Sequence, residues 1–124
     1  MATACREYQP RIFVVLSTLI FCVNPALAEP VELSGTKIAE TLSEREIIGT
    51  DNGKPSSQIF RANGATFYSV EANQTIGSWK VVEDKYCSVW PPSENWVCYD
   101  VLRDGNVIQF VSPSGNASTY TLKQ

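Results

Sequence analysis

The sequence predicts a mainly β domain, an antiparallel meander of eight strands that follows one short helix. Segments rich in β-branched and aromatic residues succeed one another from residue 46 onward, and Gly, Asn, Asp and Pro residues interrupt them at short intervals. The intervals are too short for crossover connections, so consecutive strands must lie antiparallel. Such a meander forms either a small up-and-down barrel or a strongly curved open sheet, and both remain open at this point.

Residues 1–28 have the three-part pattern of a secretory signal peptide. Two arginines precede the apolar segment Ile12–Val23, and Ala26-Leu27-Ala28 places small residues where a signal peptidase cleaves. Twelve apolar residues would span only about 18 Å as a helix, against about 30 Å of hydrocarbon in a bilayer. We therefore expect cleavage before Glu29, no membrane span afterwards, and a single periplasmic or secreted domain over residues 29–124.

The composition of residues 29–124 excludes several function classes. This part of the chain has eight Lys and Arg against twelve Asp and Glu, a net charge of −4, and the whole chain contains no histidine. Nucleic-acid binding is not expected, because it needs a surplus of basic residues. Catalytic triads, proton shuttles and metal sites that depend on histidine are excluded, because the chain has none. A glycosidase needs two carboxylates on opposite sides of one cleft. Two carboxylate pairs are conceivable, Glu83 with Asp84 and Glu94 with Asp100, but nothing in the sequence places either pair in this way. We predict a non-catalytic protein without metal, cofactor or nucleic-acid partner.

A short helix is expected at Gly35–Ser43. Ser34 is a good N-cap, and Leu33 before it can pack against Ile38 as a hydrophobic staple. Ile38 and Leu42 then belong to one apolar face. Two to three turns are not stable alone, so this helix must pack against the rest of the domain.

The eight strands are expected between turn signals. Asn63-Gly64 is the strongest hairpin signal because a type I′ turn needs a positive φ at both central residues, and Asp104-Gly105 is nearly as strong. The breaks include the segment 51–55 and Asn73-Gln74. The expected strands are Glu46–Thr50, Gln58–Ala62, Thr66–Glu71, Gly77–Val82, Tyr86–Trp90, Trp96–Arg103, Val107–Ser112 and Ser118–Leu122. In the sixth of these, the alternation assigns Val97, Tyr99, Val101 and Arg103 to the inner face.

Cys87 and Cys98 are expected to form a disulfide. They are the only cysteines after the signal segment, and paired cysteines are usual in small exported domains. A thiolate nucleophile would need a base, and a zinc site would need more ligands. A closed loop of this length stabilises a fold by about 3 kcal/mol. Pairing Cys87 opposite Cys98 also places Tyr86 opposite Tyr99 and Val89 opposite Trp96.

The order of these motifs resembles a family of small exported proteobacterial proteins that is known only as a domain of unknown function. The resemblance covers nearly all of the mature chain, from Leu33 to Leu122, and is carried by Gly77, Trp79, Cys87, Trp90, Cys98, Tyr99, Val101, Arg103, Asp104 and Gly105. It implies a periplasmic or secreted setting and a β-rich fold. It implies no catalytic residues.

Two functions fit these observations, and neither identifies the protein partner or the ligand. The first is an envelope protein-interaction or accessory module, in which the proline-stiffened loop with Trp90, Glu94 and Trp96 contacts a partner. An acidic inhibitor of a basic hydrolase is one version of it. The alternative is a small-ligand carrier with a calycin-like barrel. Ten aromatic residues in so small a domain are expected to fill the interior, which counts against the carrier.

Overall fold

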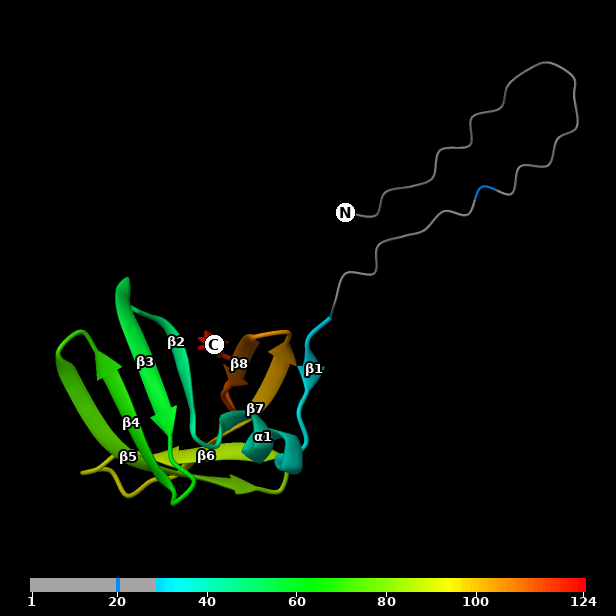
Figure 1. Cartoon of the computed structure of the whole chain (residues 1–124). Coiled ribbons are helices and arrows are strands. Elements are labelled where there is room, and N and C mark those ends of the chain that lie inside the picture. Colours follow the sequence, from blue (N-terminus) through cyan, green and yellow to red (C-terminus); the bar gives the residue numbers. More distant parts are fainter. Residues whose placement is uncertain (1–19, 21–28) are drawn as a thin grey trace, which may run out of the picture.

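The computed structural model describes Ile20 and residues 29–124 as one helix and nine strands (Figure 1). The predicted signal peptide lies outside these described residues apart from Ile20, so its cleavage stays a prediction. The elements are β1 Val31–Glu32, α1 Gly35–Leu42, β2 Arg45–Asp51, β3 Lys54–Phe60, β4 Ala65–Val70, β5 Asn73–Val82, β6 Lys85–Val89, β7 Val97–Asp104, β8 Val107–Val111 and β9 Ala117–Leu122.

The strands β2 to β9 form a closed, eight-stranded antiparallel barrel. Each strand pairs with the next along the chain, and β9 returns to pair with β2 through Leu122 opposite Ile47. The predicted meander is confirmed, and the open sheet is excluded. Closure leaves none of these eight strands as a free edge, which removes a template for aggregation.

The strand β1 was not expected. Val31 and Glu32 pair with Arg103 and Leu102 of β7, and Leu33 N donates to Val101 O at 2.8 Å. At its helix-end side, the ladder between β6 and β7 stops at the pair Tyr86 and Tyr99. The later residues of β7 have no partner in β6 along this edge, and β1 pairs with them instead. A strand of two residues has no periodicity, which is why the sequence pattern missed it.

Two strands begin earlier than expected, because the turns before them are tighter. β3 begins at Lys54 after a turn at Asn52-Gly53, where both residues have positive φ (49° and 78°). β5 begins at Asn73, because the turn between β4 and β5 lies before this residue, with a positive φ of 54° at Glu71. The expected strand starts at Gln58 and Gly77 were therefore wrong.

The predicted type I′ turn at Asn63-Gly64 was also wrong in kind. Only Gly64 has a positive φ, of 95°. Arg61 N donates to Ala65 O at 2.8 Å, so the loop holds three residues and ends in a left-handed glycine. Hairpin loops of three residues commonly end in a left-handed residue of this kind, whereas the type I′ turn belongs to loops of two residues. The hairpin itself was correctly predicted.

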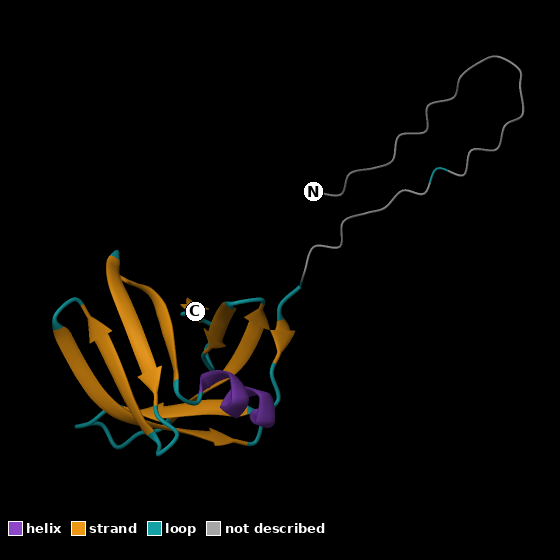
Figure 2. Ribbon diagram, viewed as in Figure 1, coloured by secondary structure: helices purple, strands orange, loops and turns teal. Residues whose placement is uncertain are grey.

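The helix α1 covers one end of the barrel, which we call the helix end (Figure 2). Ser34 caps it, as predicted, by accepting a hydrogen bond from Lys37 N at 3.4 Å. Gly35 N donates to Asp84 Oδ1 at 2.8 Å, and a Cβ at this glycine would lie 2.1 Å from Glu83 O. Only glycine therefore allows α1 to approach the turn between β5 and β6 this closely.

The main core lies beneath α1. The fully buried side chains Ile38 and Leu42 of the helix pack with inward-facing residues of the strands. Phe60 is central to this core, with its ring centroid 5.5 Å from that of Trp79 in an edge-to-face arrangement. Val101 is buried as the alternation in β7 predicted, and Arg103 Nη1 contacts Thr41 Oγ1 of the helix at 3.4 Å.

The disulfide between Cys87 and Cys98 is present, as predicted, and links β6 to β7. Tyr86 lies opposite Tyr99, which confirms the register. The expected pair of Val89 with Trp96 does not form because the ladder ends at Ser88 opposite Val97.

Candidate functional site

The end of the barrel opposite α1 contains a chamber of about 190 Å³, which we call the open-end chamber. Inward-facing side chains from six strands line it, together with the residue that follows β6. Six of the nine lining residues are aromatic. The lining residues are Gln58, Tyr68, Tyr86, Ser88, Trp90, Tyr99, Phe110, Ser118 and Tyr120.

Stacked and edge-to-face rings shape this chamber. The rings of Tyr86 and Phe110 are nearly parallel, with centroids 4.8 Å apart, and both residues are almost fully buried. The ring of Tyr86 also meets that of Phe60 edge-to-face at 5.7 Å. Tyr86 and Phe110 therefore separate the chamber from the core beneath α1. Nearer the solvent, the rings of Tyr68 and Trp90 meet edge-to-face at 6.1 Å.

A buried amide fixes one wall of the chamber. Gln58 Nε2 donates to Thr66 Oγ1 and to the Tyr86 hydroxyl, both at 3.0 Å. Thr66 Oγ1 in turn donates to Ile59 O at 2.9 Å. The amide has thus donated both of its hydrogens inside the barrel, and its carbonyl oxygen is left as an acceptor. This chain of hydrogen bonds holds the Tyr86 ring in place.

A single carboxylate stands at the mouth of the chamber. Asp51, the last residue of β2, accepts a hydrogen bond from the Tyr68 hydroxyl at 3.0 Å. Asp51 lines a wider hollow that shares Tyr68, Ser118 and Tyr120 with the chamber. Among the described residues, no lysine or arginine lines either space.

Three tyrosines of the chamber have raised pKa values. Burial raises the pKa of Tyr86 to about 12. Burial and then the hydrogen bond to Asp51 raise the pKa of Tyr68, and burial followed by the Asp51 charge raises that of Tyr120. Because a buried phenol resists ionisation, these hydroxyls stay neutral at physiological pH.

Two glycines make room for rings of the chamber. A Cβ at Gly77 would lie 2.6 Å from the Trp90 ring, and a Cβ at Gly49 would lie 2.8 Å from the Tyr120 ring. Real Cβ atoms do not approach rings so closely, so any larger residue would displace the ring. Trp90 and Tyr120 therefore occupy space that a side chain at Gly77 or Gly49 would take.

The structure separates the three candidate interaction residues of the loop. Trp90 points inward and lines the chamber. Trp96 lies on the outside, with 40% of its surface exposed and Lys80 Nζ 4.0 Å from the ring centroid. Glu94 is exposed between them. The two tryptophans therefore do not form one contact surface.

The tyrosines and Asp51 were missed as site residues. The expectation that aromatic side chains fill the interior holds at the helix end but not at the open end. The inward positions of Tyr68, Tyr86, Tyr99 and Tyr120 follow from alternation, so four tyrosines on one face of the meander were a usable signal. The position of Asp51 at a strand end gave no such signal.

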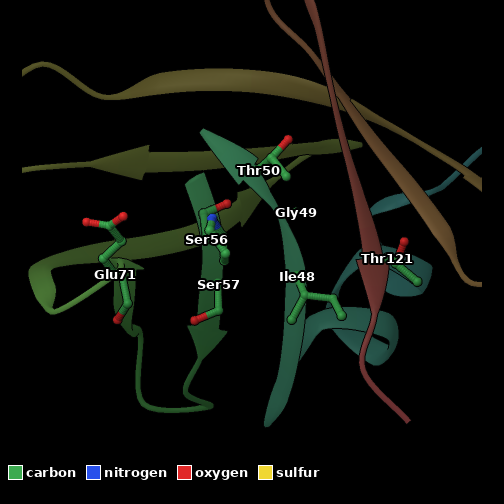
Figure 3. Close-up of a pocket in the computed structure, with 9 residues that line it drawn as sticks. Ile48, Gly49, Thr50, Ser56, Ser57, Glu71 and Thr121 are labelled. Atoms are coloured by element: carbon green, nitrogen blue, oxygen red, sulfur yellow. The ribbon is translucent and has the colours of Figure 1, made fainter. Parts of the chain in front are cut away.

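A second hollow, of about 580 Å³, lies over β2, β3 and β9 (Figure 3). Short side chains such as Ser57 and Thr121 line it, and Ile48 is its one large aliphatic residue. Its charged group, Glu71, already faces Lys54 Nζ at 3.9 Å. No aromatic residue of the described chain lines this hollow, and its charged group is already paired, so it is the weaker candidate for a binding site.

Family models, curated proteins and solved structures give no match to this chain. The resemblance to a family of exported proteins therefore stays a prediction. Within residues 29–124, no helix is long and apolar enough to cross a bilayer. In the same range, no three His, Cys, Asp or Glu residues are grouped as metal ligands would be.

Proposed function

We propose that this protein is an exported, non-catalytic barrel that binds one small ligand in the open-end chamber. The observation that carries the proposal is the contrast in filling: the barrel is packed beneath α1, whereas six strands turn aromatic, hydroxyl and amide side chains towards an unfilled space of about 190 Å³. Sites for small molecules have this composition, mainly aromatic with a few placed polar groups.

The volume limits the ligand to about the size of one ring. An apolar cavity of about 150 Å³ accommodates a benzene molecule in an engineered protein. Eight-stranded barrels are just wide enough to hold one small ligand at the mouth. A long acyl chain or an oligomer would not fit within the chamber.

The separated tryptophans provide a matched test. Phenol and indole serve as ring-sized probes, titrated by calorimetry into the oxidised protein. We expect Trp90→Ala to weaken binding at least tenfold and Trp96→Ala to leave it unchanged. Native mass spectrometry of protein from several expression hosts should detect a bound small molecule.

Two results would count against the carrier. Failure of both probes to bind, with a bare mass in every host, would contradict it. Binding weakened equally by both substitutions would place the ligand elsewhere. The protein-interaction module would be favoured instead if Trp96→Ala abolished capture of an envelope protein while the chamber bound no probe.

A further inference from the structure

We infer that the ligand of the open-end chamber is a small organic cation, with Asp51 as its counter-charge at the mouth and the surrounding aromatic rings as its cage. The inference rests on the proposed function, because it specifies the ligand class of the same chamber. It depends on three properties of the site: its charge, its ring faces and its hydrogen-bonding groups.

The charge of the site is negative and fixed in position. Asp51 is the one charged residue among those lining the chamber and the adjoining hollow in the described part of the chain. The Tyr68 hydroxyl donates to its Oδ2 at 3.0 Å, which orients the carboxylate towards the mouth. Lys54 lies opposite Asp51 in the ladder between β2 and β3, but its Nζ lies 3.9 Å from Glu71 and the residue lines neither space. Within these two spaces an anionic ligand would meet a carboxylate and, among the described residues, no lining lysine or arginine.

The rings present the surface that cations prefer. The face of an aromatic ring carries negative electrostatic potential, and a cation placed within about 6 Å of the centroid is attracted to it. The attraction is stronger where the ring is shielded from water, and the floor of the chamber is formed by the buried pair Tyr86 and Phe110. Trp90, the strongest ring type for this contact, lies at the chamber wall beside Tyr68.

The chamber offers two acceptors to a hydroxyl-bearing cation, beside five lining hydroxyls that can donate as well as accept. Gln58 has already donated both amide hydrogens, and Tyr68 donates its hydroxyl hydrogen to Asp51. The Gln58 carbonyl and the Asp51 carboxylate are left to accept. An ammonium or an alkylated ammonium group that carries a hydroxyl would match this arrangement.

Choline and 3,3-dimethylbutan-1-ol test the inference directly, because they share a shape and differ only in the cationic nitrogen. Both are titrated by calorimetry into the oxidised protein, with phenol as a neutral ring probe. We expect choline to bind at least tenfold more tightly than the alcohol. Asp51→Asn should lower choline affinity at least tenfold and leave the alcohol unchanged. Asp100→Asn, which removes a carboxylate on the outer face next to Lys85, is the matched control and should change neither.

A measurement without substitution guards against misfolding of the variant. Raising the salt concentration should weaken choline binding and leave alcohol binding unaffected, because only the former depends on charge. Equal affinity of the unsubstituted protein for choline and the alcohol, or salt-independent choline binding, would overturn the cation while leaving the chamber as a binding site. Binding of phenol but of neither choline nor the alcohol would also overturn the cation and leave the chamber as a binding site. Failure of all three probes would overturn both the cation and the proposed function.

Discussion

The helix end and the open end of the barrel follow the same inward alternation but are filled differently. At the helix end, α1 contributes Ile38 and Leu42 to a core whose central aromatic residue is Phe60. At the open end, no helix of the described residues covers the strands, and tyrosine and serine side chains contribute to the lining of a space of about 190 Å³. The packed core is therefore concentrated at one end, and the other end keeps an unfilled volume lined by hydroxyl groups.

The difference shows how a domain of this size combines a core with a cavity. A small domain buries too little surface to leave large voids at no cost. Here the helix seals one end, and the disulfide joins β6 to β7 close to the open end. The strands that line the chamber are thus held by the core at the helix end and by this disulfide.

The largest expected effect comes from the core at the helix end. Phe60→Ala should lower the free energy of unfolding by about 3–5 kcal/mol, because it removes a fully buried ring that contacts Trp79 and Tyr86. Urea unfolding followed by circular dichroism measures this change. Trp90→Ala at the open end should cost clearly less. Equal losses for the two variants would contradict the division between the ends.

The disulfide should have the next largest effect. Replacing Cys87 and Cys98 together by serine should destabilise the fold by about 3 kcal/mol, because the bridge closes a loop of sequence separation 11. Thermal melting of the oxidised protein, with and without reductant, gives the same comparison. An unchanged Tm after complete reduction would show that the barrel wall does not need this link.

Alkaline pH should lower the free energy of unfolding, because the buried Tyr86 in the floor of the chamber resists ionisation. The pKa of Tyr86 is raised to about 12 in the folded protein, whereas an exposed phenol ionises near pH 10. Below about pH 10 the Tyr86 phenol is protonated in both the folded and the unfolded protein, so its contribution to the free energy of unfolding is fully present there. Between about pH 10 and 12 only the unfolded chain loses the proton, so the free energy of unfolding falls as pH rises, by on the order of 2 kcal/mol.

Tyr86→Phe tests this assignment, because it removes the titrating group and keeps the ring. Urea unfolding at about pH 9 and about pH 11 should show a smaller alkaline loss in the variant than in the unsubstituted protein. Lysines titrate in both proteins and cancel in the comparison. Identical losses would mean that another group is responsible.

The smallest effect is expected on the outer face. Trp96→Ala removes the contact with Lys80 Nζ at 4.0 Å and should cost no more than about 1 kcal/mol. Lys80→Met should give a similar loss in urea unfolding. A loss well above 1 kcal/mol for Trp96→Ala alone would mean that this ring supports the barrel wall through packing.

Local patterns predicted those parts of the fold that depend on near neighbours in the chain. The Ser34 cap, the hairpin around Gly64 and the pairing of Cys87 with Cys98 each involve one short segment or two adjacent strands. The two-residue strand β1 was missed because it is defined by its partner in β7. The site was missed for a related reason: Trp90 and Trp96 are six positions apart in one loop, yet they lie on opposite sides of the wall.

The sequence by itself determined the meander, which face of most strands turns inward, and the negative charge of the domain. Only the tertiary structure decided that the sheet closes, which end α1 covers, and where an unfilled space remains. The physical reason is that alternation specifies the direction of a side chain but not what lies across from it. Gln58, Tyr86 and Tyr120 meet around one chamber only after β9 has paired with β2.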